Sequence, residues 1–399
     1  MSGFVRTVGK IASIVAAVAL AIPTGGMSIG AAMAVGFVST AATLVAVGAG
    51  LASSLLFRPK WPSTTSEASN RLTPSIDPRT PRKIVFGRTA FATDIRDQEL
   101  SSEQDFLHRF IVCASHEVAS IDEIWFDDKL AWSQAGGYTA AFSGYFLHAN
   151  RLVGTAGDAV NLSSRMGGTR RYSGLAYVYF RYKLTGNDKK VESPFAQSIP
   201  TRVTIVGNGA LIYDPRLDST VAGGSGPMRA DNQTTWGWDD DAARNPALQL
   251  LWYHLGWRIQ NPTTGEWRLA VGKGIPHQRI DLASFITAAN LCDEPVTLAA
   301  GGTQPRYRTD GVFSEGDATA VVLDQLKACM NAELDDVDGK IRITVAHNDL
   351  ATPIADFSED DILGEFTWEQ TAPLDEMFNV VRGTFIDPSA NSLYQAVDY

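Results

Sequence analysis

A run of 47 consecutive residues near the N-terminus, residues 11–57, contains no charged side chain and constrains this chain more than any other feature. Its composition is mainly Ala, Val, Gly, Ile and Leu, interrupted at residues 23–26 by Pro-Thr-Gly-Gly. A surface this apolar does not stay exposed to water without associating with something. The part from 27 to 57 exceeds the ~20 apolar residues that span a bilayer, and Arg58 closes it. Residues 1–57 are therefore predicted to form a hydrophobic helical segment.

Three interpretations of this segment stay open. One is a signal peptide or anchor, because Arg6 and Lys10 precede the apolar residues in the manner of a charged n-region. Another is a helical hairpin that turns at residues 23–26 and packs through small residues. The third is a segment stored inside a protein assembly and released into a membrane later. The candidate membrane or tape-measure contacts are its large apolar residues: Ile11, Ile14, Val15, Val18, Leu20, Ile22, Ile29, Val35, Phe37, Leu44, Val47, Leu51, Leu55, Leu56 and Phe57.

The rest of the chain has the composition of a β-rich protein. Short runs of Val, Ile, Tyr, Phe and Thr recur between Gly, Pro and Asp clusters, which is typical of strands. The predicted class is α+β, dominated by β-structure and multidomain, with β-barrel or β-sandwich domains, a few amphipathic helices and the N-terminal hydrophobic helical segment. The predicted parts are a hydrophobic segment at 1–57, a Pro/Ser/Thr-rich linker at 58–82, a β-rich domain at 83–216, a connecting region of loop and helix at 217–280, and an α+β domain at 281–399.

Strands are predicted from short apolar runs bounded by polar residues. The region 127–169 is expected to form long loops, because it is rich in Gly, Ser and Ala. The strand at 175–184 is aromatic or aliphatic on both faces, which indicates a strand covered on two sides. The predicted strands are 83–87, 106–114, 121–126, 175–184, 201–207, 331–335, 340–345 and 395–399, with a hairpin turn at Asp338-Gly339.

Three amphipathic helices are predicted. The first spans 245–257, with Asn245 as N-cap and Pro246 as the first helical residue. Two more begin at Asp281 and Asp317. The predicted buried stripe of the last helix consists of Val321, Val322, Leu326, Cys329 and Met330.

Charge and cysteine spacing exclude some function classes. The net charge of −10 argues against binding nucleic acid through clustered Lys and Arg. Cys113, Cys292 and Cys329 lie far apart in apolar stretches and form no CxxC pair, so neither a zinc site nor a disulfide framework is indicated. All three are predicted to be small buried hydrophobic residues.

No catalytic or cofactor motif is complete. His116-Glu117 starts like a zinc-protease motif, but Ser120 stands where the second histidine ligand belongs. The acidic run 239–241 lacks the alternating spacing of a calcium loop and is interpreted as a solvated acidic turn. The six scattered histidines are expected to be structural. The sequence therefore predicts no catalytic residue, no metal ligand and no cofactor.

A series of strings along residues 83–399 resembles one protein family. The strings, in order, are FLHRFIVCASHEV (106–118), IDEIWFDD (121–128), GLAYV (174–178), YDPR (213–216), NPAL (245–248), AAN with CD (288–293), RY with Gly311 (306–311), DGK (338–340), and NVV with DP (379–388). In this order they resemble the tip-attachment, or central tail-hub, proteins of lambda-like long-tailed bacteriophages. None of the strings is catalytic, because they mark turns, caps and strand starts.

The resemblance implies a virion protein located at the tail tip, and not an enzyme. Such a protein is a homotrimer whose β-rich domains continue and close the tail tube. Its implied partners are further copies of itself, the tail tube and distal tail proteins, and the tape measure protein. DNA would pass through without specific binding, which suits an acidic lumen. Contact with a host membrane or receptor is expected through the N-terminal segment or a part of the protein beyond residue 399, because family members are commonly longer.

The N-terminal apolar segment departs from the best-known family members, which start with polar sequence. Two other functions therefore remain as alternatives. One is a membrane-anchored or exported bacterial β-rich protein that uses residues 11–57 as its anchor. The other is a tail-associated hydrolase that opens the cell wall.

Overall fold

The structure, a computed structural model, describes residues 80–91, 93–101, 104–153, 172–184, 193–195, 198–261, 263–299, 301–347, 383–389 and 393–398, and the single residues 358, 361 and 364. The chain divides into two compact units, Met1–Thr64 and Thr65–Tyr399, and all described residues lie in the second. The apolar segment and its fifteen candidate contact residues lie outside the described residues. Within the described part, no helix has the length and apolarity to cross a bilayer. The domain limits given above stay predictions.

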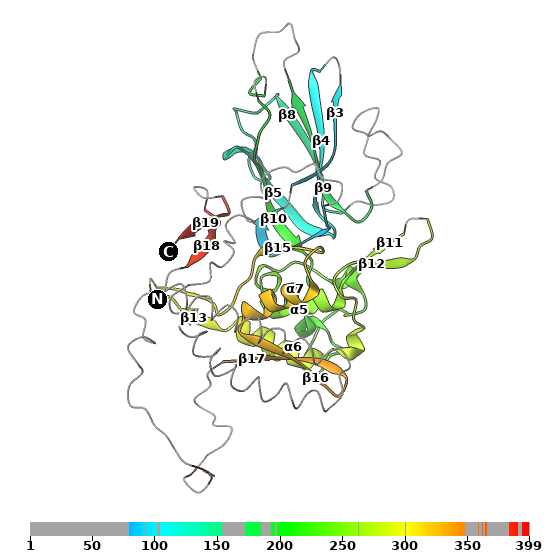
Figure 1. Ribbon diagram of the computed structural model, residues 1–399, viewed down its shortest axis with the longest axis vertical. Coiled ribbons are helices and arrows are strands. Elements are labelled where there is room, and N and C mark those ends of the chain that lie inside the picture. The colour runs from blue at the N-terminus through cyan, green and yellow to red at the C-terminus, as the bar shows by residue number, and fades with distance from the viewer. Residues whose placement is uncertain are drawn as a thin grey trace, which may run out of the picture. The chain divides into compact units, whose positions relative to one another are not determined.

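The described residues form the predicted α+β class, with strands dominating and few helices (Figure 1). One sheet has four antiparallel strands in the order β3-β4-β9-β8, with bounds β3 Asp94–Ser101, β4 Phe106–Ala114, β9 Ala176–Lys183 and β8 Phe146–Arg151. The second has five strands in the order β2-β10-β5-β6-β7, with bounds β2 Arg88–Ala90, β10 Val203–Ala210, β5 Val118–Phe126, β6 Lys129–Ser133 and β7 Gly137–Tyr138.

The two sheets share one apolar core, because the inward residues of both belong to a single buried cluster. Phe126 of β5 lies at its centre, with its ring 5.0 Å from that of Phe146 and 5.8 Å from that of Phe180. Strand β9 is covered on both faces, as predicted: Phe180 faces this core, while Tyr177 packs with Phe110 on the opposite face.

Several strands were not predicted, among them β2 and β3, and one region was predicted as something else. Residues 127–169 were expected to form long loops, but they contain β6, β7 and β8. The sequence of β8 gives little indication of a strand, because Phe146 is its only fully buried side chain. Its strand conformation depends instead on pairing with the strongly apolar β9. By contrast, β4 has the predicted bounds, and β5 starts three residues before the predicted 121.

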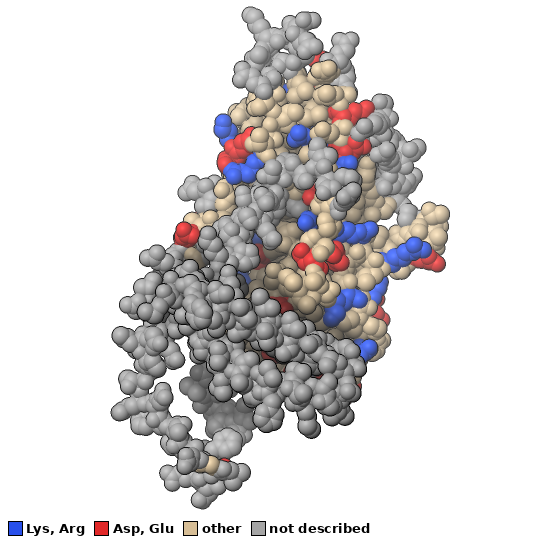
Figure 2. Space-filling view, in the orientation of Figure 1, with Lys and Arg blue, Asp and Glu red and all other residues tan. Residues whose placement is uncertain are grey.

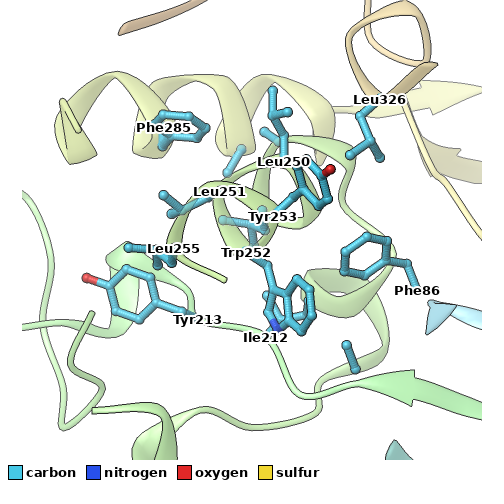
Figure 3. Packing of buried hydrophobic residues seen from close by; sticks show 14 of the residues in the cluster. Phe86, Ile212, Tyr213, Leu250, Leu251, Trp252, Tyr253, Leu255, Phe285 and Leu326 are labelled. Atoms are coloured by element: carbon cyan, nitrogen blue, oxygen red, sulfur yellow. The ribbon is translucent and has the colours of Figure 1, made fainter. Parts of the chain in front are cut away.

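The helices surround a second core (Figure 3). Their bounds are α4 Asp240–Ala243, α5 Pro246–Leu255, α6 Leu282–Cys292 and α7 Thr319–Ala328, with short 3-10 helices η2 Pro215–Leu217, η3 Gln233–Thr235 and η4 His277–Arg279. Helix α5 begins as predicted. The Asn245 side chain accepts hydrogen bonds from the amides of Ala247 (3.0 Å) and Leu248 (3.4 Å), and Pro246 occupies the first turn. Gly256 ends the helix with φ of 72°.

The prediction that α5 is amphipathic is wrong, because all ten of its residues are buried. Even the polar side chains of Gln249 and His254 are at most 1% exposed. The reason is that α5 contacts α6 and α7 and also belongs to the cluster that contains Phe86 of β1 (Lys83–Phe86). A helix enclosed in this way has no face left for water.

The predicted stripe on α7 is too wide. Val322, Leu326 and Met330 are buried, but Val321 is 46% exposed and Cys329 is exposed. Residues spaced by four along one side of a helix contact α5, and neighbours one position away turn toward solvent. The prediction of buried cysteines therefore holds for Cys113 and Cys292 and is wrong for Cys329.

The remaining strands form two-stranded pairs. Strand β1 connects the two cores, because Ile84 and Phe86 belong to the helical cluster and Val85 between them belongs to the sheet cluster. The Asp338-Gly339 turn has the predicted positive φ angles, 54° and 75°. The pairs are β1 with β15 (Gly311–Ser314), β11 (Trp257–Gln260) with β12 (Trp267–Val271), β13 (Pro295–Thr297) with β14 (Thr303–Pro305), β16 (Ala332–Val337) with β17 (Lys340–Val345), and β18 (Thr384–Asp387) with β19 (Gln395–Asp398). Of these strands, β11, β12, β13, β14, β15 and β18 were not predicted.

Candidate assembly surface

The lengths of the edge strands differ between the two large sheets. The five-stranded sheet ends in strands of three and two residues, β2 and β7. The four-stranded sheet ends in β3 with eight residues and β8 with six. No other strand of the described residues pairs with the outer side of β3 or β8. Long edges present rows of backbone donors and acceptors and invite pairing with another chain, whereas short edges are protected.

Acidic residues dominate the β3 edge. Its sequence, DIRDQELS, carries three carboxylates and one guanidinium. Asp94 is 8% exposed and lies 3.7 Å from Arg96, and burial raises its pKa. Asp97 and Glu99, further along the strand, are half-buried. Like charges placed opposite each other destabilise strand pairing, so this composition disfavours pairing of β3 with a second β3.

The opposite side of the sheet is basic and contains no carboxylate on β8 or β9. Arg151 ends β8 and is exposed, and Leu147 in the same strand is 46% exposed. On β9, Arg181 lies over the ring of Phe106 at 5.0 Å, and Lys183 is exposed. Burial lowers the pKa of the neighbouring His148 to about 4, so that it is neutral at pH 7. The β3 edge therefore carries an excess of carboxylates, and the β8 edge carries one positive side chain, Arg151, next to the cationic residues of the interior strand β9.

Strand direction matters as much as charge. All three pairings in this sheet are antiparallel, and with four strands the two edges run in opposite directions. If β8 of one copy met β3 of another, the pair would continue the antiparallel pattern without inverting either copy. Such a contact joins two different surfaces, and repeating it by rotation gives a closed ring.

Charges elsewhere on the molecule do not form a single field. Figure 2 shows Lys and Arg interspersed with Asp and Glu over the described part of the visible face. Mixed signs of this kind provide solubility and do not form a basic groove for nucleic acid.

The incomplete motif at His116 is part of the core. Its Nε2 atom accepts the Val85 amide at 2.9 Å, and its Nδ1 atom lies 2.6 Å from the carbonyl oxygen of Glu117. Burial lowers the pKa of His116 to about 4. The imidazole therefore stays neutral and fixes β1 against the turn before β5.

The acidic run 239–241 was interpreted as a solvated turn, and the structure shows a short helix start paired with arginines. Asp239 caps α4 by accepting the Ala242 amide at 3.1 Å. Asp240 lies 3.6 Å from Arg244, and Asp241 pairs with an arginine further along the chain. Across the described ranges, no group of three or more His, Cys, Asp or Glu residues is arranged to hold a metal ion.

A pocket of about 660 Å³ lies between the β18–β19 hairpin and the five-stranded sheet. Its charged groups pair with one another. Arg244 donates to both carboxylate oxygens of Asp310, at 2.9 and 2.6 Å, and the Arg88 amide donates to the same carboxylate at 2.9 Å. The Arg88 guanidinium also pairs with Asp122. Tyr394 of the hairpin completes the wall, and burial raises its pKa. The hairpin is joined to the sheet by Tyr394, which packs with Ala90 and Val206.

No protein-family model and no curated protein matches the chain. One solved structure that it resembles is described as the virion of a native gene transfer agent particle. The alignment has 14% sequence identity and a TM-score of 0.33, and it covers 76% of this chain. The chain spans 64% of the length of that protein.

Proposed function

We propose that this chain is a structural subunit of a bacteriophage tail tip, the central hub or tip-attachment protein. Three copies form a ring that continues and closes the tail tube and contacts the tape measure protein. The ring supports host adsorption and lets DNA leave without binding it specifically. The observation that carries this proposal is the four-stranded sheet, whose two long edges have opposite charge and opposite direction.

The ordered strings support the assignment to a tail hub. Three of them lie where the described chain turns or begins an element. The string YDPR forms the start of η2, where the Asp214 side chain accepts the Arg216 amide at 2.9 Å. The string NPAL is the N-cap and first turn of α5, and DGK is the turn between β16 and β17. A hub of this kind works mechanically, so its recurring residues are expected to be those that fix the fold.

Head-to-tail pairing of the edges supports a ring. Pairing of β3 with β8 would extend the sheet from one copy into the next at both of its long edges. The acidic β3 edge repels a second β3 but attracts the basic β8 side, so an isologous dimer is disfavoured and a heterologous contact is favoured.

Charge reversal at the edges tests the proposal. Glu99→Lys makes β3 less acidic, and Arg151→Glu makes the β8 edge acidic, so each single variant should weaken assembly of the full chain. The double variant exchanges the charges at positions 99 and 151 and should restore part of the assembly that each single variant loses. Arg306→Glu, a reversal away from both edges, serves as control. Light scattering and native mass spectrometry report the number of copies. If all four variants assemble like the wild type, the edges are not the contact.

The N-terminal segment receives a separate role in this proposal. Residues 11–57 lack charge and must be shielded until needed, either in the tube lumen or on the tape measure protein. Adsorption then frees them to help breach a host membrane. Particles lacking residues 1–57 should assemble and adsorb but fail to deliver DNA. Normal delivery by these particles would defeat this part of the proposal.

A membrane-anchored protein is the second candidate, and the same uncharged segment favours it. Fractionation of the tagged chain, expressed without other phage proteins, distinguishes the two functions. An anchored protein partitions with membranes and stays monomeric, whereas a hub forms rings.

A further inference from the structure

The β18–β19 hairpin, residues 384–398, is called the clasp below. Figure 1 shows it in red, as a small hairpin of its own. Its two strands pair with each other, and among the strands and helices that the structure describes neither makes an extensive contact with any other element. An isolated two-stranded hairpin is marginally stable in water, so the clasp depends on the surface against which it docks.

Hydrogen bonds within the clasp fix its turn. The Tyr394 amide donates to the Asp387 carbonyl at 2.8 Å, and the Leu393 amide donates to the Ser389 carbonyl at 2.8 Å. The Asp387 carboxylate accepts the amide and the hydroxyl of Ser389 at 2.9 and 2.7 Å. Leu393 and Tyr394 have φ angles of 45° and 61°, which residues other than glycine adopt only where their surroundings impose them. The clasp itself therefore positions the Tyr394 side chain.

Tyr394 docks on the outer face of the five-stranded sheet. Its side chain packs with Ala90 of β2 and Val206 of β10, and Trp125 of β5 lies against this group. This face is opposite the apolar core, because Ile205, the neighbour of Val206, belongs to that core. Tyr394 is 7% exposed, and the pocket of about 660 Å³ lies beside it. The clasp thus holds the sheet mainly through one buried aromatic ring.

The clasp has apolar side chains on both faces. Ile386 lines the pocket above the sheet. Phe385, the preceding residue of the same strand, points to the opposite face, where it pairs across the hairpin with Val397. Phe385 is 47% exposed. Apolar residues on both faces are typical of strands that are covered on both sides, and docking on one sheet covers only one face of the clasp.

The chain between β17 and β18 is long enough for the clasp to reach another copy. It consists of 38 residues, 346–383. A chain of this length spans up to about 130 Å when extended, compared with a radius of gyration of about 20 Å for a compact unit of this size. The entropic cost of closing such a connection rises only slowly with its length. The connection therefore does not restrict the clasp to the sheet of its own copy.

We propose that neighbouring copies of this chain exchange their clasps, so that Tyr394 of one copy packs on Ala90, Trp125 and Val206 of the next. The exchanged contact buries the same side chains as the contact within one copy, so no interaction is lost. A clasp between two copies can also be covered on both faces. This inference rests on the proposed function, because it requires the chain to assemble with itself, and it names a link between copies in addition to the sheet edges.

Site-specific photo-crosslinking of the full chain, kept soluble in mild detergent, tests the exchange. One chain carries an affinity tag and a photoreactive phenylalanine derivative in place of Tyr394, and it is co-expressed with wild type that carries a different tag. The expected product is a covalent dimer with both tags, in which position 394 of one chain is joined to residues 88–90, 123–125 or 203–210 of the other. The same photoreactive residue in place of Trp267, an exposed aromatic residue of another hairpin, is the control and should not reach these residues.

A substitution provides a second measurement. Tyr394→Ser removes the ring that docks on the sheet and should weaken association of the full chain about thirtyfold, as expected for loss of an aromatic residue at the centre of an interface. Trp267→Ser is the matched control, because Trp267 is 51% exposed on a hairpin that takes no part in the exchange, and it should leave association unchanged. Analytical ultracentrifugation over a range of concentrations reports the association constants.

The outcomes separate this inference from the proposed function. If the wild type is monomeric at every concentration, both fail. If the wild type forms rings but position 394 is crosslinked only within its own chain, the clasp stays on its own sheet and only the exchange is wrong. Rings of Tyr394→Ser that associate as tightly as the wild type overturn the exchange in the same way.

Discussion

The buried N-cap of α5 should contribute more to stability than any exposed cap of this chain. Asn245 is fully buried and uses both ends of its side-chain amide. The oxygen caps α5, and the nitrogen donates to the Ala289 carbonyl at 3.0 Å and to the Asp293 carboxylate at 2.9 Å. Loss of the cap costs about 1 kcal/mol. Leaving the buried Ala289 carbonyl without this donor, and the partly exposed Asp293 carboxylate with one donor fewer, costs about 2 kcal/mol more. Asn245→Ala should therefore lower the free energy of unfolding by about 3 kcal/mol.

The assay is urea unfolding of the full chain followed by tryptophan fluorescence, since Trp252 lies in the same helix and core. Asn245→Ser keeps a capping oxygen and should recover about 1 kcal/mol. Asn232 provides a matched control, because it caps the exposed η3 through the Thr234 amide at 3.2 Å. Asn232→Ala should cost below about 1 kcal/mol. Equal losses for the two alanine variants would refute the argument that burial of the donated bonds sets the cost.

Three further predictions concern the core. Burial lowers the pKa of His116 from 6.5 to about 4. The neutral imidazole therefore stabilises the fold above pH 6.5, and this contribution, up to about 3 kcal/mol, is lost as the pH falls toward 4. In urea unfolding, the free energy of unfolding of His116→Gln should decline less between pH 6.5 and 4 than that of the wild type, and an equal decline would contradict the prediction. Gly207→Ala places a Cβ 2.2 Å from a carbonyl oxygen of β5, so it should lower the free energy of unfolding by about 2 kcal/mol and lower the Tm. Gly237→Ala is the control, because the nearest atom to its Cβ is 3.7 Å away, and it should leave the Tm nearly unchanged. Val322→Ala should lower the free energy of unfolding by about 1.5 kcal/mol, because Val322 is buried, whereas Val321→Ala, at an exposed position, should lower it by less than about 0.5 kcal/mol. Similar losses for the two variants in urea unfolding would mean that α7 is oriented differently.

Local signals in the sequence predicted much of the fold. Asn245-Pro246 fixes the start of α5, and Asp338-Gly339 fixes the β16–β17 turn, because each pair has a backbone preference that needs no tertiary context. Strand β4 was found because nearly all of its side chains are apolar and buried. The local sequence of these elements is therefore enough to predict them.

Elements that depend on their neighbours were missed or misjudged. Strand β8 has only Phe146 and Leu147 as large apolar residues, of which Leu147 is exposed, and it pairs with β9. The burial of Gln249 and His254 follows from packing around α5, which no periodicity in the helix reveals. The two edges of the candidate assembly surface depend on strand order, and strand order brings together segments that are distant in the chain, such as Phe106 of β4 and Lys183 of β9.

The number and symmetry of copies test the central claim most directly. Averaged electron-microscope images of isolated particles, with this chain labelled at its C-terminus, should show three labels arranged about the tail axis at its distal end. A chain that is missing from particles, or that purifies only as a monomer at every concentration, would contradict the account.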